Sequence, residues 1–150
     1  MHKTIVLVAV LAAAAVAAGQ DRPKAPAKAD VDAIQGSWVA SAAEVNGGPM
    51  GADSLKLVRL RVEGDKYTWQ INELGPERGT LKLAPEKKPK ALDLRCKEGN
   101  NQDRTLPAIY RLDGQTLTVC YELGDGERPK DFKAPAGTMR LAVTYRREKP

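Results

Sequence analysis

The side chains that most often perform chemistry in proteins are sparse in this sequence. His2 is the only histidine among 150 residues, and it precedes the apolar stretch 4–18. If that stretch is removed during export, the mature chain has no histidine. It then cannot build a Ser-His-Asp or Cys-His triad, a histidine base or a histidine metal ligand. Because no other activated nucleophile is visible, we predict a protein that is not an enzyme and needs no cofactor.

Two thiols are the next candidates for chemistry. On the alternating strands described below, Cys96 falls on the inward face and Cys120 on the outward face. The expected strand 105–112 separates their strands by roughly 9–10 Å, whereas a disulfide needs Cα atoms within about 7 Å. We therefore expect free thiols, although a shift in strand register would allow the bond. Two thiolates without a histidine also make a poor metal site, so we predict no metal.

Paired carboxylates could perform acid–base hydrolysis. The candidates are Glu44, Asp65, Glu73 and Glu77. Each lies near a turn signal, where acidic residues are common, and only Glu44 falls on a predicted inward face. The pattern does not favour a catalytic pair.

The N-terminus has the pattern of a signal peptide. Residues 1–18 combine a basic start with an apolar stretch too short for a confident membrane span, and small residues permit cleavage after Ala18 or Gly19. We expect an exported protein, periplasmic or secreted, with no transmembrane segment in the mature chain. An uncleaved anchor is the alternative.

The mature chain is organised as a leader and one domain. The Pro/Ala/Lys composition of residues 19–29 predicts a flexible leader. Asp30 is placed to cap a short helical turn. Residues 30–150 are long enough for one domain with a modest core.

Charge does not indicate a nucleic-acid partner. The net charge of the whole chain is +5, but the signs interleave. The basic run EKKPK at 86–90 could contact an anionic polymer or a lipid head group. It has no interleaved aromatic residues, which argues against single-strand nucleic-acid binding. The ordinary interpretation is a solvated turn between two strands.

Apolar residues recur with period two through the rest of the chain, the pattern of half-buried strands. With the strand that begins at Trp38, the alternation predicts eight short strands joined mostly by Gly- or Pro-containing turns. Eight sequential antiparallel strands favour an up-and-down barrel, which has no exposed edge, over a sandwich. The residues predicted to face inward include Val58, Leu60, Val62, Tyr67, Trp69, Ile71, Leu81, Leu83, Leu92, Leu94, Leu106, Ala108, Tyr110, Leu112, Leu117, Val119, Tyr121, Met139, Leu141, Val143 and Tyr145.

Gly36 and Trp38 open the first strand with the spacing Gly-x-Trp. This motif resembles the Gly-x-Trp of lipocalins and related small barrels. The resemblance implies that Trp38 closes the floor of the barrel beneath an arginine from the last strand. Arg147 continues the inward phase of that strand, so we predict that it packs on Trp38, with Gly36 allowing a close approach.

A second resemblance covers nearly the whole mature chain. It is carried, in order, by IQGSWVASAAEVNGGPM, VEGDKYTW, GTLKLAPEKKPKALDL, IYRLDGQTLTVCY and ERPKDF. Together these stretches are similar to the uncharacterised lipocalin-like domain family abundant in planctomycete bacteria. That family has no assigned biochemical function, so the resemblance implies a barrel and export and carries over no catalytic residue.

The barrel interior is the remaining place for a function. An eight-stranded barrel either fills with side chains or holds one small ligand. Small residues at Ala40, Ala42 and Ala108 could leave room near the mouth. We predict a small apolar pocket there, in which the polar atoms of bulky aromatic residues bind the ligand. These ligand-binding residues are Tyr67, Trp69, Tyr110 and Tyr121.

The long loop 124–137 carries the only phenylalanine, Phe132. It could lid the mouth or contact a partner, but we expect Phe132 to plug the loop onto the barrel. The leading hypothesis is a non-enzymatic protein that binds a small apolar or amphipathic molecule in the barrel mouth. The alternative is a filled-barrel interaction module, an inhibitor or envelope-associated adaptor that acts through its loops. The sequence does not predict the oligomeric state.

Overall fold

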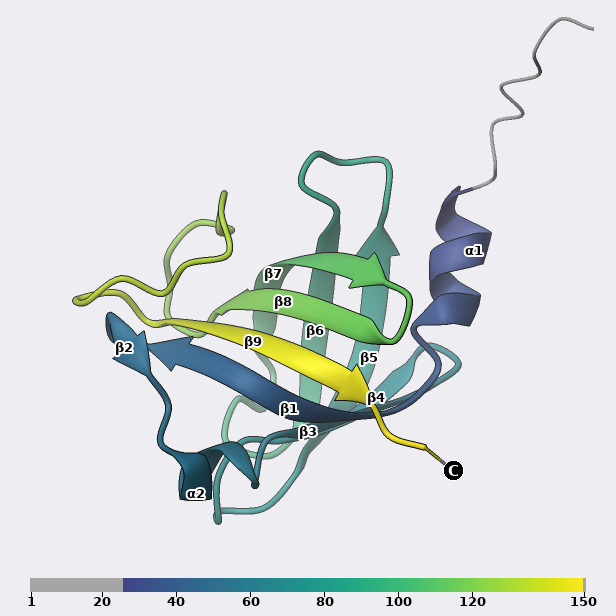
Figure 1. The fold of residues 1–150 in the computed structure, drawn as a ribbon. Helices are drawn as coiled ribbons and strands as arrows, with labels where there is room; N and C mark the ends of the chain where they lie inside the picture. Colours follow the sequence, from purple (N-terminus) through teal and green to yellow (C-terminus); the bar gives the residue numbers. More distant parts are fainter. Residues whose placement is uncertain (1–25, 150) are drawn as a thin grey trace, which may run out of the picture.

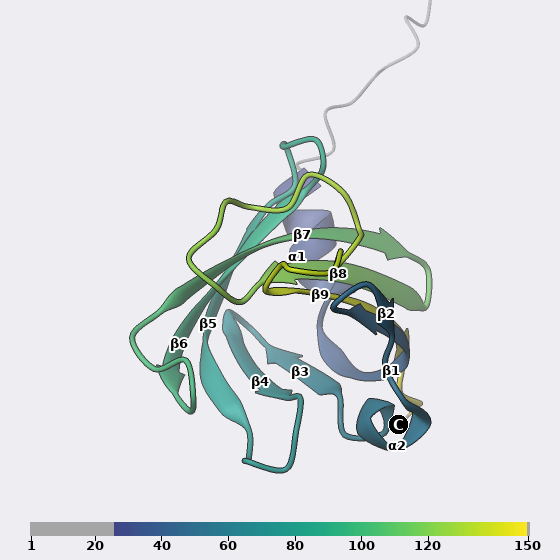
Figure 2. The same cartoon turned by 90° about the vertical axis from the view of Figure 1, so that its left-hand side faces the viewer.

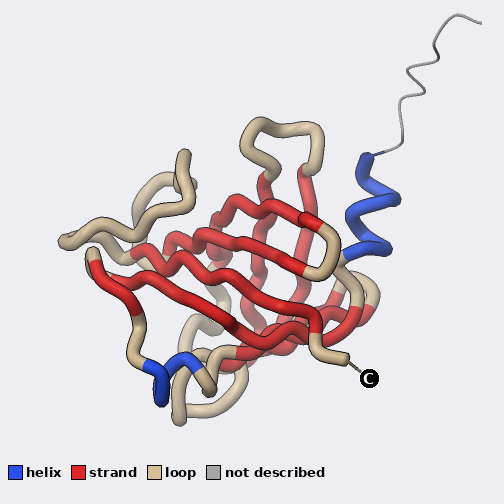
Figure 3. Tube along the Cα trace, in the orientation of Figure 1, coloured by secondary structure: helices blue, strands red, loops and turns tan. Residues whose placement is uncertain are grey.

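The computed structural model describes residues 26–149, so the predicted signal peptide and most of the predicted leader lie outside the described residues. Strands dominate the described chain, with two short helices (Figure 3). None of the helices in this part is long and apolar enough to cross a membrane. In chain order the elements are α1 (Pro26–Ala33), β1 (Gly36–Val45), β2 (Gly48–Pro49), α2 (Ala52–Leu55), β3 (Arg59–Glu63), β4 (Lys66–Gln70), β5 (Glu77–Ala84), β6 (Ala91–Glu98), β7 (Thr105–Asp113), β8 (Thr116–Glu122) and β9 (Arg140–Arg147).

The strands close into an eight-stranded antiparallel up-and-down barrel (Figure 1). The order β1-β3-β4-β5-β6-β7-β8-β9 follows the chain apart from β2, and β9 pairs with β1 to close the ring. The two-residue β2 pairs only with the end of β1. The predicted fold class, a barrel of lipocalin-like type, is confirmed.

Helix α1 lies at one end of the barrel, and β2 and the long loop lie at the other (Figure 1). We call these the helix end and the loop end. Because α1 begins at Pro26, the last residues of the predicted leader are helical. The prediction that Asp30 caps a turn is wrong, since Asp30 lies inside α1. Its carboxylate instead accepts hydrogen bonds from Lys90 Nζ at 2.9 Å and Tyr110 Oη at 2.6 Å, which join α1 to the barrel.

The predicted barrel floor is present at the helix end. Trp38 is fully buried and pairs across strands with Arg147, whose guanidinium carbon lies 4.2 Å from the centre of the Trp38 ring. The Trp38 indole N–H donates to the carbonyl oxygen of Ile34 at 2.9 Å. Gly36 has a φ of 108°, a conformation that favours glycine. Arg147 also donates to the carbonyls of Ala33 and Gln35, so one side chain covers the Trp38 ring and the end of α1.

A β-bulge at Ser41 changes the phase of β1. Ala40 lies opposite Tyr145, but the next pair joins Ala42 to Thr144, so Ser41 has no partner of its own. An extra residue moves every following side chain to the opposite face. The predictions that Ala42 and Glu44 face inward are therefore wrong, and both face outward.

The other strands keep their predicted phase, with one local exception. Met139 precedes β9 and its side chain is 64% exposed, so its predicted inward position is wrong. From Leu141 onward, the alternate residues of β9 face the core as predicted.

Candidate functional site

The centre of the barrel is filled by a hydrogen-bonded aromatic group. Trp69 and Tyr121 stack with ring centres 4.4 Å apart. The Trp69 indole N–H donates to Tyr145 Oη at 3.0 Å, and the hydroxyls of Tyr121 and Tyr145 lie 2.8 Å apart. All three residues are at most 1% exposed. Their polar atoms bind one another, and burial raises the pKa of both tyrosines.

The other two predicted ligand-binding residues, Tyr110 and Tyr67, lie in different surroundings. Tyr110 is at the helix end, where its hydroxyl donates to Asp30. Tyr67 is 2% exposed, and its hydroxyl finds no hydrogen-bond partner among the described residues. Burial, with the neighbouring Cys96 thiol, raises the pKa of Tyr67. The structure therefore does not bring the four predicted residues together around an open mouth; they are parts of the core.

The candidate carboxylate Glu77 is buried at the loop end, which the sequence analysis did not predict. Glu77 is 1% exposed and pairs across strands with Trp69. Its Oε1 accepts a hydrogen bond from Asn101 Nδ2 at 2.6 Å, and Cys96 Sγ lies 4.0 Å from its Oε2. Burial raises the pKa of Glu77, although the Asn101 hydrogen bond and the Arg104 charge oppose the shift. Of the four candidate carboxylates only Glu77 is buried, so they form no inward-facing pair.

Glu77→Gln should remove part of the pH dependence of stability. The folded state binds the Glu77 proton more tightly than the unfolded state, because the folded pKa is raised. This contribution to stability is complete below the unfolded pKa and is lost as pH rises through the folded pKa. Urea unfolding between about pH 4 and pH 8 should show the wild type losing stability with pH relative to the glutamine variant. Parallel curves for the two proteins would contradict this assignment.

The two cysteines are free and lie on opposite faces of the barrel wall, as predicted, and both are buried. Cys96 lies beside Glu77 inside the barrel, and burial raises the pKa of its thiol. Cys120 lies outside, beneath the long loop, and burial raises its pKa to about 11. Neither thiol is therefore an activated nucleophile.

The long loop 124–137 crosses the outer wall of the barrel, in front in the view of Figure 2. Phe132 packs against a small outer cluster, as predicted for a plug; the cluster comprises Ile109, Cys120, Ala134 and Ala142. The Arg111 guanidinium carbon lies 4.9 Å from the centre of the Phe132 ring. Earlier in the loop, Arg128 also binds the barrel wall, because it donates to the carbonyls of Leu92 at 3.0 Å and Ala108 at 2.9 Å.

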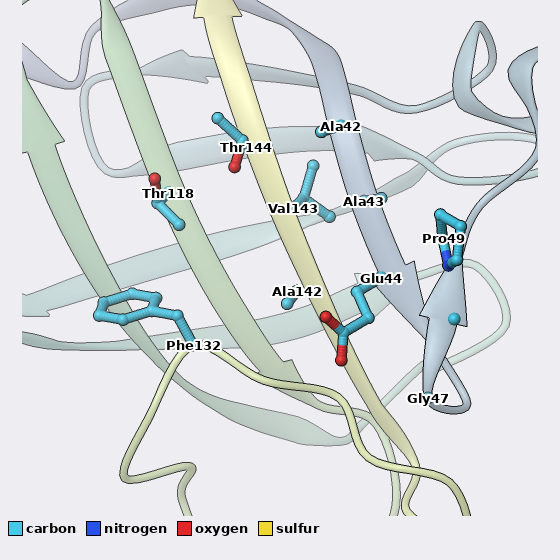
Figure 4. Close-up of a pocket in the computed structure, with 11 residues that line it drawn as sticks. Ala42, Ala43, Glu44, Gly47, Pro49, Thr118, Phe132, Ala142, Val143 and Thr144 are labelled. Carbon is cyan, nitrogen blue, oxygen red and sulfur yellow. The ribbon is translucent and has the colours of Figure 1, made fainter.

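A groove of about 350 Å³ lies on this outer wall, between the Phe132 side of the loop and the β1–β2 turn (Figure 4). We call it the outer groove. It is mostly apolar, with a few hydroxyls and one carboxylate on its surface. Its lining is Ala42, Ala43, Glu44, Gly47, Gly48, Pro49, Thr118, Phe132, Ala142, Val143 and Thr144.

The bulge in β1 helps to build this groove. It turns Ala42 and Glu44 outward, beside the outward-facing Ala142 and Thr144 of β9. The small side chains of Ala42 and Ala142 form the bottom of the groove, and Phe132 and Pro49 lie on its two sides (Figure 4). Glu44 Oε1 accepts a hydrogen bond from the Ala134 amide at 3.1 Å, and the Gly47 amide donates to the Ala134 carbonyl at 2.7 Å. These two bonds tie the loop to the β1–β2 turn at one side of the groove.

Fold and site together define a closed antiparallel barrel with a filled interior and a preformed groove on its outer wall. Within residues 26–149, no three His, Cys, Asp or Glu side chains gather as metal ligands. No family model, no curated protein and no solved structure matches this chain.

Proposed function

We propose that the protein is an exported, non-enzymatic barrel of the lipocalin-like kind that binds a small apolar or amphipathic molecule, and that the outer groove holds this molecule. The observation that carries the proposal is the groove itself. Its volume of about 350 Å³ and its mainly apolar lining with a few polar groups are typical of small-ligand sites.

The contrast with the barrel interior supports this location. Inside, Trp69, Tyr121 and Tyr145 are buried and satisfy one another's polar atoms. A ligand there would have to displace packed side chains, which costs free energy. In the groove, Thr144 and Glu44 are partly exposed and could orient a polar group beside the alanine floor.

Filling the groove should weaken binding. Ala42 is exposed and faces outward, so Ala42→Leu adds bulk in the groove and leaves the core unchanged. We expect the affinity for a hydrophobic fluorescent probe to fall about tenfold or more, the equivalent of roughly 1.4 kcal/mol. Ala52→Leu, at the exposed start of α2, is the matched control and should bind as the wild type does.

Native mass spectrometry of the protein from its own exported fraction addresses the ligand directly. An added small-molecule mass that Ala42→Leu removes supports the proposal. An added mass that survives Ala42→Leu would place the ligand elsewhere. A second polypeptide would instead favour the interaction module acting through its loops.

A further inference from the structure

The opposite side of the long loop forms a second, basic pocket of about 330 Å³. There the loop meets the β5–β6 turn, which contains the EKKPK run. Lys87 and Lys88 come from the turn, and Arg128 and Lys130 come from the loop, over a floor that includes Ala91 and Ile109. Two basic segments about forty residues apart in the chain thus share one concave surface.

The cations of this region fall into two groups. Arg128 and Lys90 are used structurally: Arg128 Nη2 lies 2.7 Å from Asp93 Oδ1, and Lys90 Nζ lies 2.9 Å from Asp30 Oδ2. Lys87, Lys88 and Lys130 are exposed and form no ion pair with any described residue. The pocket lining holds one acidic residue, Glu127, so an excess of positive charge remains.

Both walls are held in place by contacts beneath the free lysines. Arg128 binds two strand carbonyls as well as Asp93, which fixes the loop on β6 and β7. The Tyr110 amide donates to the Lys90 carbonyl at 2.9 Å, which fixes the base of the turn. A site whose walls are already ordered loses less entropy when a ligand binds.

The floor limits the kind of anion. Most of the accessible surface of the pocket is apolar: Pro89 is exposed among the lysines, and the buried Ala91, Ile109 and Pro129 close the floor beneath it. The free charges therefore lie around an apolar centre. From this arrangement we infer that the basic pocket binds an amphipathic organic anion. Its carboxylate or phosphate head contacts Lys87, Lys88 and Lys130, and the adjoining apolar part lies on the floor. This inference goes beyond the proposed function and does not depend on the outer groove.

The test is calorimetric titration of the purified protein with dodecyl phosphate below its micelle concentration. Lys87→Gln/Lys88→Gln/Lys130→Gln should weaken binding about tenfold to a hundredfold. The matched control is Lys66→Gln/Lys82→Gln/Lys97→Gln, which removes the same charge from exposed strand positions outside the pocket and should bind as the wild type does. Ala42→Leu should retain the binding that the pocket triple variant loses, which separates this pocket from the outer groove.

Two further probes define the ligand. Inorganic phosphate should bind more weakly than dodecyl phosphate, and equal binding would overturn the role of the apolar floor. The anion is a lipid head group if the protein binds vesicles containing phosphatidylglycerol, does not bind phosphatidylcholine vesicles, and loses the vesicle binding in the pocket triple variant. Binding of the free amphiphile alone indicates a soluble anion. Equal losses in the pocket and control variants, or no binding of either probe, would overturn the inference.

Discussion

Trp38→Ala should lower the free energy of unfolding by about 3–5 kcal/mol, the range for truncating a buried aromatic side chain. Trp38 is 0% exposed and belongs to the main core. Its removal deletes the contact with Arg147 and the hydrogen bond to Ile34 that joins β1 to the segment after α1. Urea unfolding followed by circular dichroism measures the change.

Trp38→Phe is the control, because it keeps an aromatic ring beneath Arg147 and should cost less. A double-mutant cycle with Arg147→Met isolates the cation–π contact, for which we expect a coupling of roughly 0.5–2 kcal/mol. A Trp38→Ala variant as stable as the wild type would show that Trp38 does not close the barrel floor.

The floor could be predicted from sequence because its signals are local and periodic. Gly-x-Trp identifies the start of β1, and the phase of β9 from Leu141 places Arg147 on the inward face. Antiparallel closure then brings Arg147 opposite Trp38. The period-two pattern likewise predicted the eight barrel strands, since half-buried strands alternate apolar and polar residues.

The outer groove could not be predicted, because the residues around Ser41 carry no periodic signal. The stretch from Ala40 to Ala43 contains only alanine and serine, which suit either face of a strand. A bulge in such a stretch leaves no trace in the hydrophobic pattern. The groove also needs Phe132, and the loop that carries it is bonded to Glu44 through the Ala134 amide, 90 residues away along the chain.

The position of Glu77 illustrates a signal that was present and not used. Extending the phase of Leu81 and Leu83 backward through Gly79 places Glu77 on the inward face. Its nearness to a turn suggested a solvated residue. Instead, Asn101 from the loop between β6 and β7 donates a hydrogen bond to it, and Arg104 from the same loop donates to Asn101.

The sequence predicted that the aromatic residues face inward, but this direction does not decide whether they bind a ligand or fill the core. Inward tyrosine and tryptophan side chains suit either a ligand pocket or a core. The choice depends on whether their polar atoms meet one another, and that requires the three-dimensional register. Trp69 and Tyr145 are 76 residues apart in the chain, and their hydrogen bond follows only from barrel closure.

Trp69→Ala tests this assignment to the core, and we expect it to lower the free energy of unfolding by about 3–5 kcal/mol. Trp69 is 0% exposed, stacks on Tyr121 and donates to Tyr145, so its removal leaves a cavity and takes away a hydrogen-bond donor. The vacated space has the shape of an indole ring. Added indole should therefore raise the melting temperature of the variant, because a ligand that binds only the folded state stabilises it.

Binding by the outer groove gives an independent measure on the same variant. At temperatures where Trp69→Ala remains folded, a hydrophobic probe should bind it as it binds the wild type, since Trp69 does not line the groove. Trp69→Phe, which keeps a ring against Tyr121, should lose less stability and should not respond to indole. The opposite pattern would be full stability for Trp69→Ala with probe binding lost. That result would make Trp69 a binding residue, move the ligand into the barrel and contradict the outer groove as its site.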